Sequence, residues 1–134
     1  MAAAGEKKKL LLIDDDETHL SIAENILKSE YETVTVKSGK EALDSLWSGY
    51  RPEIILLDIS LPTMDGWDTY NKIKEISTQY VIPMAFLISE SEKSSLNDSP
   101  RIGVSDYILK PFIREDLLFR VKTIIENSEN NGRR

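Results

Sequence analysis

The feature that most constrains this chain is the alternation of short apolar or β-branched runs with segments of helical period. The runs lie at residues 10–13, 33–36, 54–57, 84–88 and 107–109. Between them, and after the last, apolar residues recur three and four positions apart, which is the spacing of one buried helix face. Strands that alternate with helices through short connections favour βαβ units. We therefore predict an α/β fold, a doubly wound five-stranded parallel sheet with helices on both faces.

The segment at residues 90–100 is the exception to this pattern. It contains a single apolar residue, Leu96, among many turn-forming residues, and Pro100 stands at its end. Without an apolar face to bury, this segment gains little from packing as a helix on the sheet. We expect the fourth helix to be short, irregular or mobile.

Length and composition limit the chain to one domain without thiol chemistry. Its 134 residues are enough for one hydrophobic core, and the absence of cysteine excludes disulfides, Cys-ligated metals and thiol nucleophiles. The net charge of −6 is unfavourable for binding nucleic acid or an anionic membrane, and no apolar run approaches the ~20 residues of a membrane span. We expect a cytoplasmic domain at residues 8–127, a disordered segment at 1–7 and a disordered tail or linker stub at 128–134.

Charged residues follow three of the predicted strands. Asp14 and Asp15 come directly after the first, Asp58 after the third and Lys110 after the fifth. Because the carboxyl ends of parallel strands meet at one edge of the sheet, we expect these groups to converge. Clustered carboxylates need a cation and suit Mg²⁺, and a carboxylate also serves as a nucleophile toward phosphorus. Together they form the set that phosphoryl transfer requires: ligands for a divalent metal, a nucleophile and a fixed positive charge.

The residues next to this set receive structural interpretations. Asp16 and Glu17 precede the first helix, where acidic side chains favour the positive end of the helix dipole. His19, the only histidine, lies early in that helix, and we expect a solvated side chain there. We expect Trp47 and Trp67 to cover contacts between the helices and the sheet.

Three separate motifs carry a resemblance to a known family. They are Leu-Leu-Ile-Asp-Asp at residues 11–15, Leu-Leu-Asp-Ile-Ser-Leu-Pro-Thr-Met-Asp-Gly at 56–66 and Tyr-Ile-Leu-Lys-Pro-Phe at 107–112. In this order they resemble a response-regulator receiver domain of the chemotaxis-regulator type, over residues 8–127. The resemblance implies a flavodoxin-like fold with strand order 2-1-3-4-5.

The resemblance also implies a function in a two-component phosphorelay. Asp58 would accept a phosphoryl group from a sensor histidine kinase or a histidine phosphotransfer protein, and the domain would signal to an output protein by a conformational change. Mg²⁺ or Mn²⁺ would be held by Asp14, Asp15, Asp58 and the backbone carbonyl of Ser60. Such a domain phosphorylates and dephosphorylates only itself and is not an enzyme with a separate substrate.

The last two strands supply the rest of the implied site. Lys110 would contact the phosphoryl group, and its peptide bond to Pro111 would be cis. The family places a Ser or Thr hydroxyl at the end of the fourth strand, coupled to an aromatic residue that Tyr107 matches here. The family spacing from Lys110 falls on Ile88, which has no hydroxyl. We expect a one-residue shift to give Ser89 the phosphoryl-binding and switching role; if Ile88 holds the position, the link to Tyr107 is lost.

Two other functions fit parts of the sequence. A degenerate receiver that serves as a constitutive interaction domain fits Ile88 and the weak fourth helix. A haloacid-dehalogenase-like phosphatase fits residues 14–18, which match that family's D-x-D-x-T with Asp14 as the nucleophile. The short chain, without a cap segment and with its strongest motif at Asp58, argues against the phosphatase. No recognition helix follows the receiver pattern, so we expect no nucleic-acid binding by this chain.

Overall fold

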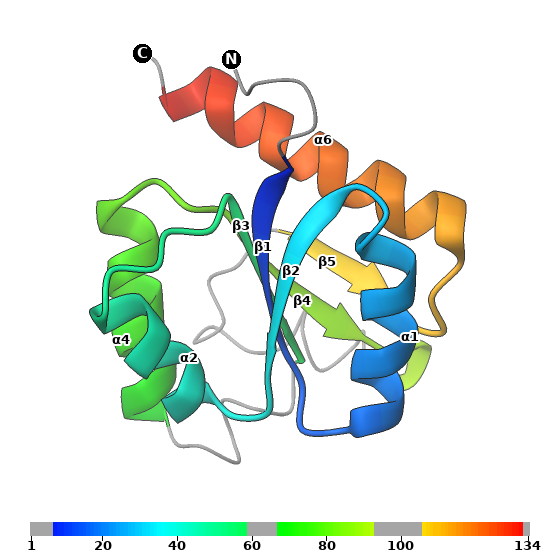
Figure 1. Cartoon of the computed structure of the whole chain (residues 1–134), viewed down its shortest axis with the longest axis horizontal. Coiled ribbons are helices and arrows are strands. Elements are labelled where there is room, and N and C mark those ends of the chain that lie inside the picture. The colour runs from blue at the N-terminus through cyan, green and yellow to red at the C-terminus, as the bar shows by residue number, and fades with distance from the viewer. Residues whose placement is uncertain (1–6, 59–66, 93–105, 133–134) are drawn as a thin grey trace.

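A computed structural model describes residues 7–58, 67–92 and 106–132, which form a parallel sheet flanked by helices (Figure 1). The strands are β1 (Lys8–Ile13), β2 (Tyr31–Val36), β3 (Ile54–Asp58), β4 (Met84–Ile88) and β5 (Asp106–Leu109). The helices are α1 (Glu17–Leu27), α2 (Gly39–Trp47), α4 (Trp67–Gln79) and α6 (Arg114–Gly132), and one 3₁₀ turn, η1 (Glu90–Glu92), follows β4. Every strand predicted from the sequence is present.

The order of the strands brings β1 and β3 together at the centre of the sheet. The order is β2-β1-β3-β4-β5, and every neighbouring pair is parallel. This confirms the predicted α/β fold and the strand order that the resemblance implies. Ile13 of β1 lies beside Leu57 of β3. Asp14 and Asp58, which directly follow these two residues, are therefore neighbours at the carboxyl ends of the strands. This place lies near the point where the strand order reverses, which is where open α/β sheets bind ligands.

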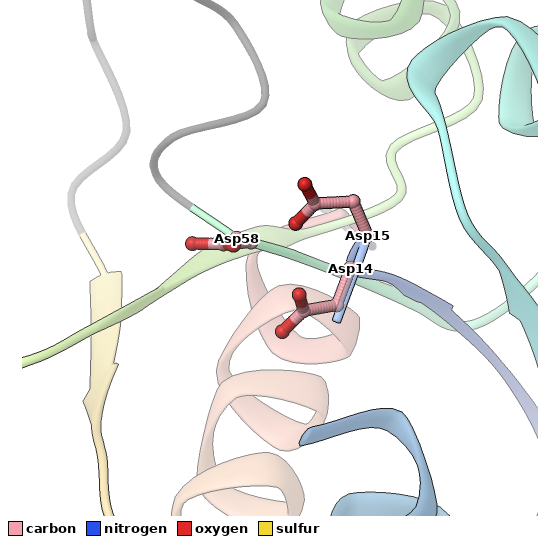
Figure 2. A group of neighbouring side chains, drawn as sticks. All are labelled: Asp14, Asp15 and Asp58. Carbon is pink, nitrogen blue, oxygen red and sulfur yellow. The ribbon is translucent and has the colours of Figure 1, made fainter. Parts of the chain in front are cut away.

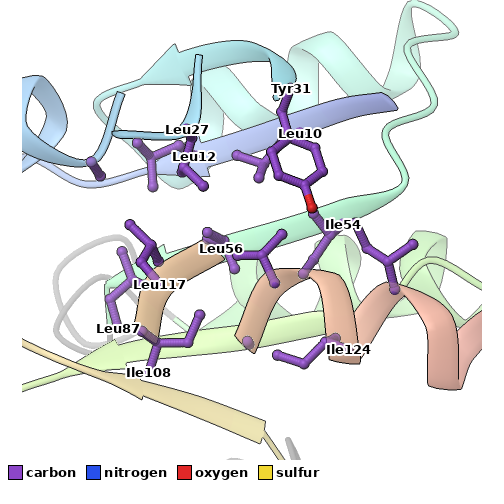
Figure 3. Packing of buried hydrophobic residues seen from close by; sticks show 14 of the residues in the cluster. Leu10, Leu12, Leu27, Tyr31, Ile54, Leu56, Leu87, Ile108, Leu117 and Ile124 are labelled. Atoms are coloured by element: carbon purple, nitrogen blue, oxygen red, sulfur yellow. The ribbon is translucent and has the colours of Figure 1, made fainter. Parts of the chain in front are cut away.

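Two apolar clusters, one on each face of the sheet, hold the fold together. Alternate residues of β1 point to opposite faces. Leu10 and Leu12 belong to the cluster under α1 and α6, whereas Leu11 and Ile13 belong to the cluster under α2 and α4. All four are fully buried, and Figure 3 shows the first cluster. Cover on both faces explains why this strand is continuously apolar rather than alternating.

Side-chain caps fix where α1 and α2 begin. Asp16 accepts a hydrogen bond from the backbone N–H of His19, and Ser38 accepts one from that of Glu41, each at 3.1 Å. Each cap satisfies a backbone donor that the first turn of a helix leaves unpaired. The Asp16 cap starts α1 two residues after Asp15, so the first turn of this helix lies directly beside the end of β1.

The C-terminal helix is longer than the sequence predicts. Residues 128–132 belong to α6, where we expected a disordered tail or linker stub. The Lys8 ammonium lies 2.7 Å from Glu129 Oε2, and the Ser128 hydroxyl donates to the Val81 carbonyl at 3.4 Å. These polar contacts tie down a stretch that has no apolar anchor, so hydropathy does not reveal it. Like the other described helices, α6 lacks the long apolar stretch that crossing a membrane requires.

The predicted role of Trp47 is wrong. This side chain is 62% exposed at the end of α2, and the Lys72 ammonium of α4 lies 5.9 Å from its ring centroid. Three other expectations fall on parts of the chain outside the described residues: the side chain of Trp67, the N-terminal residues 1–6, and the irregular helix at 90–100 beyond the η1 turn.

Candidate functional site

Three aspartates gather at the carboxyl edge of the sheet. Asp14 and Asp15 follow β1, and Asp58 ends β3, the parallel neighbour of β1. One carboxylate oxygen from each lies within 4.8 Å of the others (Figure 2). Asp14 and Asp58 are buried, at 1% and 6% exposure, whereas Asp15 is exposed. The acidic cluster, as we call these three residues, therefore combines two desolvated carboxylates with one that solvent reaches.

Lys110 brings a positive charge to the acidic cluster. It follows β5, and its Nζ lies 3.4 Å from Asp14 Oδ2 and 3.6 Å from Asp58 Oδ1. Its side chain is only 11% exposed. Its backbone N–H donates to the Ile88 carbonyl at 2.7 Å, which anchors the residue to the end of β4. The structure thus brings together the three carboxylates and the lysine that the sequence places at strand ends.

Within residues 7–58, 67–92 and 106–132, the side chains of the protein do not balance the charge of the acidic cluster. Burial raises the pKa of Asp14, and the neighbouring charge of Asp58 raises it further. The backbone N–H of Asp16, which donates to Asp14 Oδ1 at 3.0 Å, and the Lys110 ammonium lower the pKa without cancelling the rise. Ionised Asp14 is therefore held at a cost in free energy. Among the described side chains one lysine faces three carboxylates, so a bound cation would relieve this cost.

The donor set of the acidic cluster fits a hard divalent cation. Three carboxylate oxygens at this separation are placed to share one ion, and carboxylates are the side chains by which Mg²⁺ is held in proteins. Cysteine is absent from the sequence, so metals that prefer thiolate ligands are disfavoured. Ser60, the source of the predicted carbonyl ligand, lies outside the described residues.

His19 also belongs to this site, and the expectation of a merely solvated side chain is wrong. Its Nδ1 lies 3.2 Å from Lys110 Nζ and 3.6 Å from Asp14 Oδ2, although 42% of the side chain is exposed. The sequence does hold a signal for this contact. A histidine four residues after Asp15, in the first turn of a helix that starts at once, has to lie near the same edge of the sheet.

At the end of β4 an apolar side chain and a hydroxyl occupy successive positions. Ile88, the last residue of β4, is fully buried in the cluster under α2 and α4. Ser89 follows it, half-buried, with its Oγ 3.0 Å from the Oγ of Ser91 in η1. Tyr107 is half-buried and packs against the cluster that contains Ile88. The hydroxyl at this end of β4 is thus that of Ser89, and its switching role with Tyr107 stays a prediction.

A groove lined by β5, the segment after it and α6 lies beside the acidic cluster. The peptide bond between Lys110 and Pro111 is cis, as the resemblance implies. The groove, of about 740 Å³, lies between β5 and α6, and both Tyr107 and Lys110 line it. Ile113 and Phe119 at its border are 58% and 68% exposed. Lys110 therefore connects the acidic cluster to an exposed apolar surface.

Comparison with known protein families gives one consistent result. The family model described as "Response regulator receiver domain" matches residues 10–122. The chain is 30% identical over 116 residues to the alkaline phosphatase synthesis transcriptional regulatory protein PhoP of Bacillus subtilis, which covers 86% of this chain and 47% of PhoP. It is 32% identical over 112 residues to the response regulator SaeR of Staphylococcus epidermidis, over 83% of this chain and 47% of SaeR. The chain thus spans about half the length of these curated relatives.

Solved structures resemble the whole sheet with its helices. A response regulator receiver domain protein from Methanospirillum hungatei is 31% identical with a TM-score of 0.73, over 93% of this chain and 99% of that one. The N-terminal domain of a response regulator/sensory box/GGDEF protein from Carboxydothermus hydrogenoformans is 28% identical with a TM-score of 0.77, over 92% of this chain and 98% of that one. These likenesses extend over nearly the full length of each domain.

Proposed function

Since the chain belongs to the response regulator receiver domain family, the signalling domains of two-component systems, we propose that it accepts a phosphoryl group on Asp58. The donor would be a phosphohistidine on a sensor histidine kinase or a histidine phosphotransfer protein. The observation that carries the proposal is the surroundings of the Asp58 carboxylate. It lies within 4.8 Å of the other two carboxylates of the acidic cluster, and its Oδ1 is 3.6 Å from Lys110 Nζ.

The groups around Asp58 have the chemistry that this transfer needs. A carboxylate oxygen of Asp58 would attack phosphorus, so that an acyl phosphate bond forms while the phosphorus–nitrogen bond to the donor imidazole breaks. The departing imidazole keeps the electron pair of that bond and takes up a proton. Lys110 would neutralise charge on the transferred phosphoryl oxygens. Its side chain is 11% exposed, so this interaction acts in a poorly solvated environment and is strong.

The acidic cluster would hold the metal on which phosphoryl transfer depends. We propose that Asp14, Asp15 and Asp58 bind Mg²⁺ or Mn²⁺, with the backbone carbonyl of Ser60 as a further predicted ligand. When bound, the ion supplies positive charge to a phosphoryl oxygen. The raised pKa of Asp14 supports this proposal, because a cation removes the cost of keeping a buried carboxylate ionised.

We propose that the phosphorylated domain signals through the groove between β5 and α6. Ser89 would bind the phosphoryl group by its hydroxyl, and Tyr107, which lines the groove, would change position with it. The exposed side chains of Ile113 and Phe119 would then contact an output protein. Burial of exposed apolar area of this kind is what stabilises most protein–protein contacts.

The two alternative functions have less support. The haloacid-dehalogenase-like hypothesis requires Asp14 as the nucleophile, but groups of the protein already contact both of its carboxylate oxygens. These groups are the backbone N–H of Asp16 and the ammonium of Lys110. The degenerate-receiver hypothesis gives no reason for the assembled acidic cluster and its lysine, which cost stability unless they bind something.

Phosphorylation by acetyl phosphate in the presence of Mg²⁺ separates the three functions. We expect the wild-type chain to gain the mass of one phosphoryl group and Asp58→Ala to gain none. Labelling that survives in Asp58→Ala and disappears in Asp14→Asn would instead establish the phosphatase-type nucleophile. A beryllofluoride titration, followed by tryptophan fluorescence, addresses the degenerate receiver. A wild-type chain that binds no beryllofluoride at saturating Mg²⁺ contradicts the proposed phosphoryl acceptor.

A further inference from the structure

We propose that His19 is a positioning residue for Lys110: its neutral imidazole accepts a hydrogen bond from the Lys110 ammonium and holds it at the acidic cluster. The inference rests on the proposed function, since it assigns a further residue to the same site. Lys110 Nζ lies 3.2 Å from His19 Nδ1, a shorter distance than the 3.4 Å to Asp14 Oδ2 and the 3.6 Å to Asp58 Oδ1.

The direction of this hydrogen bond follows from the donors and acceptors available. An ammonium group only donates, so the Nδ1 atom of His19 has to present its lone pair, with the ring proton on Nε2. The 3.6 Å between His19 Nδ1 and Asp14 Oδ2 then joins two acceptors and is not a hydrogen bond. His19 is therefore an acceptor for Lys110 and not a donor to Asp14.

Three described side chains lie within 4 Å of the Lys110 ammonium, and of these His19 is the one that is not also expected to bind a metal ion. Asp14 and Asp58 belong to the acidic cluster, whose oxygens would also bind a divalent cation, and His19 is not part of that cluster. A neutral imidazole, moreover, orients the ammonium without neutralising its charge. His19 would thus keep Nζ in place while leaving its positive charge for the phosphoryl oxygens.

The first turn of α1 holds His19 in position for this role. Its backbone N–H donates to Asp16 Oδ1 at 3.1 Å, which is the cap that starts the helix. The backbone N–H of Asp16 donates in turn to Asp14 Oδ1 at 3.0 Å. The imidazole is therefore carried on a turn that is itself hydrogen-bonded to the acidic cluster, so its place relative to Lys110 is well defined.

Three side chains at position 19 test the role of the acceptor atom. Leucine fills similar space without an acceptor, and asparagine places its amide oxygen close to the position of Nδ1. We expect His19→Leu to lower the rate of phosphorylation by acetyl phosphate about threefold to tenfold at saturating Mg²⁺. His19→Asn should restore the rate to within about twofold of wild type. The exposed Ser21→Leu on the same helix is the matched control and should leave the rate unchanged.

Coupling to Lys110 distinguishes positioning from a general effect on the fold. We expect His19→Leu to cause no further loss in a Lys110→Met background, because the group that it positions is already gone. The inference is overturned if His19→Leu equals wild type, if His19→Asn is as slow as His19→Leu, or if the loss is the same in the Lys110→Met background.

A measurement without phosphoryl transfer separates this inference from the proposed function. The ¹⁵N chemical shifts of the His19 ring should show a proton on Nε2 and a hydrogen-bonded Nδ1, and the Nδ1 signal should shift in Lys110→Met. Protonation of Nδ1 in the wild-type chain overturns the inference whether or not Asp58 is phosphorylated. Wild-type protein that shows the expected ring signals but takes no phosphoryl group refutes the proposed function and leaves the hydrogen bond established.

Discussion

Charged side chains form ion pairs at both ends of the parallel strands, but their burial and charge balance differ between the two ends. Where β1 begins, Lys8 and Glu129 form an ion pair at 2.7 Å between side chains that are 41% and 39% exposed. At the carboxyl edge, Lys110 Nζ lies 3.4 Å from Asp14 and 3.6 Å from Asp58, and all three side chains are at most 11% exposed. The first pair is shorter, but water and salt screen it, so we expect it to contribute at most ~1 kcal/mol. The longer contacts of Lys110 with Asp14 and Asp58 lie where solvent is largely excluded, so water and salt screen them less.

The difference shows that burial and charge balance, rather than contact distance, set the candidate functional edge apart. Near the start of β1 one lysine meets one glutamate, and neither is desolvated. At the ends of β1 and β3, three carboxylates share one lysine among the residues that the structure describes, and two of the carboxylates are buried. An unbalanced, buried cluster costs stability, and such clusters are characteristic of sites that bind a ligand.

The largest expected effect at the carboxyl edge is the loss of phosphorylation in Asp58→Asn. The substitution removes the nucleophile while keeping the shape of the side chain, so phosphorylation by acetyl phosphate should fall on the order of 10³-fold or more. The melting temperature should stay the same or rise, because a charge next to Asp14 is removed. Mass spectrometry and thermal unfolding measure the two effects. A phosphoryl group that still attaches in Asp58→Asn would show that another residue is the acceptor.

Lys110→Met should affect both chemistry and stability. We expect phosphorylation to slow on the order of 10²-fold, because the charge that faces the phosphoryl oxygens is lost. In the absence of Mg²⁺ the melting temperature should also fall, since the buried carboxylates of Asp14 and Asp58 lose the positive charge of the Lys110 ammonium. Mg²⁺ should restore most of that stability but not the rate. Lys8→Met is the matched control, and an equal loss of stability in both variants would break the contrast between the two edges.

Asp14→Asn should stabilise the metal-free protein. Burial raises the pKa of Asp14 in the folded state above its ordinary value of 3.8, so the folded protein binds this proton more tightly than the unfolded chain does. Stability from this group is therefore present below pH 3.8 and is lost as the pH rises through the folded-state value. At neutral pH the ionised Asp14 carboxylate therefore lowers the free energy of unfolding. Asparagine removes the charge and still offers an oxygen to the Asp16 N–H.

Thermal unfolding at several pH values measures this stabilisation. Without Mg²⁺ at pH 7, the melting temperature of Asp14→Asn should exceed that of wild type by about 4 °C, equivalent to about 1 kcal/mol. The gain should narrow as the pH is lowered. Mg²⁺ should reverse the order, because it stabilises the chain with the full acidic cluster more strongly. A gain that grows toward low pH would contradict the assigned sign.

The sequence predicts the fold well because its main signal is local. Continuous apolar runs such as residues 54–57 identify strands that are covered on both faces, and a parallel sheet then forces Asp14, Asp58 and Lys110 to one edge. The sequence is less informative where a side chain contacts a distant partner and neither the end of a strand nor a motif marks that side chain. His19 was assigned to solvent because its partner, Lys110, lies 91 residues away in the chain.

The same limit explains the wrong prediction for the end of α6. The end of α6, at residues 128–132, is polar and was expected to be disordered. Its contacts are made with Lys8 and Val81, which are remote in sequence. The prediction for Trp47 is wrong in the opposite direction. The apolar character of this side chain predicts burial, but at the last position of α2 its ring remains largely exposed beside Lys72.

The smallest expected effect is that of the ion pair near the start of β1. A double-mutant cycle of Lys8→Met and Glu129→Gln should give a coupling free energy of at most ~1 kcal/mol, and salt should reduce it, because both side chains are partly solvated. Phosphorylation should stay within about twofold of wild type in all three variants, since neither residue is near the acidic cluster. The pair does hold the last turns of α6 against β1, so hydrogen exchange at residues 128–132 should increase in the variants. A coupling that is larger than this, or that persists in high salt, would show that distance predicts the strength of charge interactions here better than burial does.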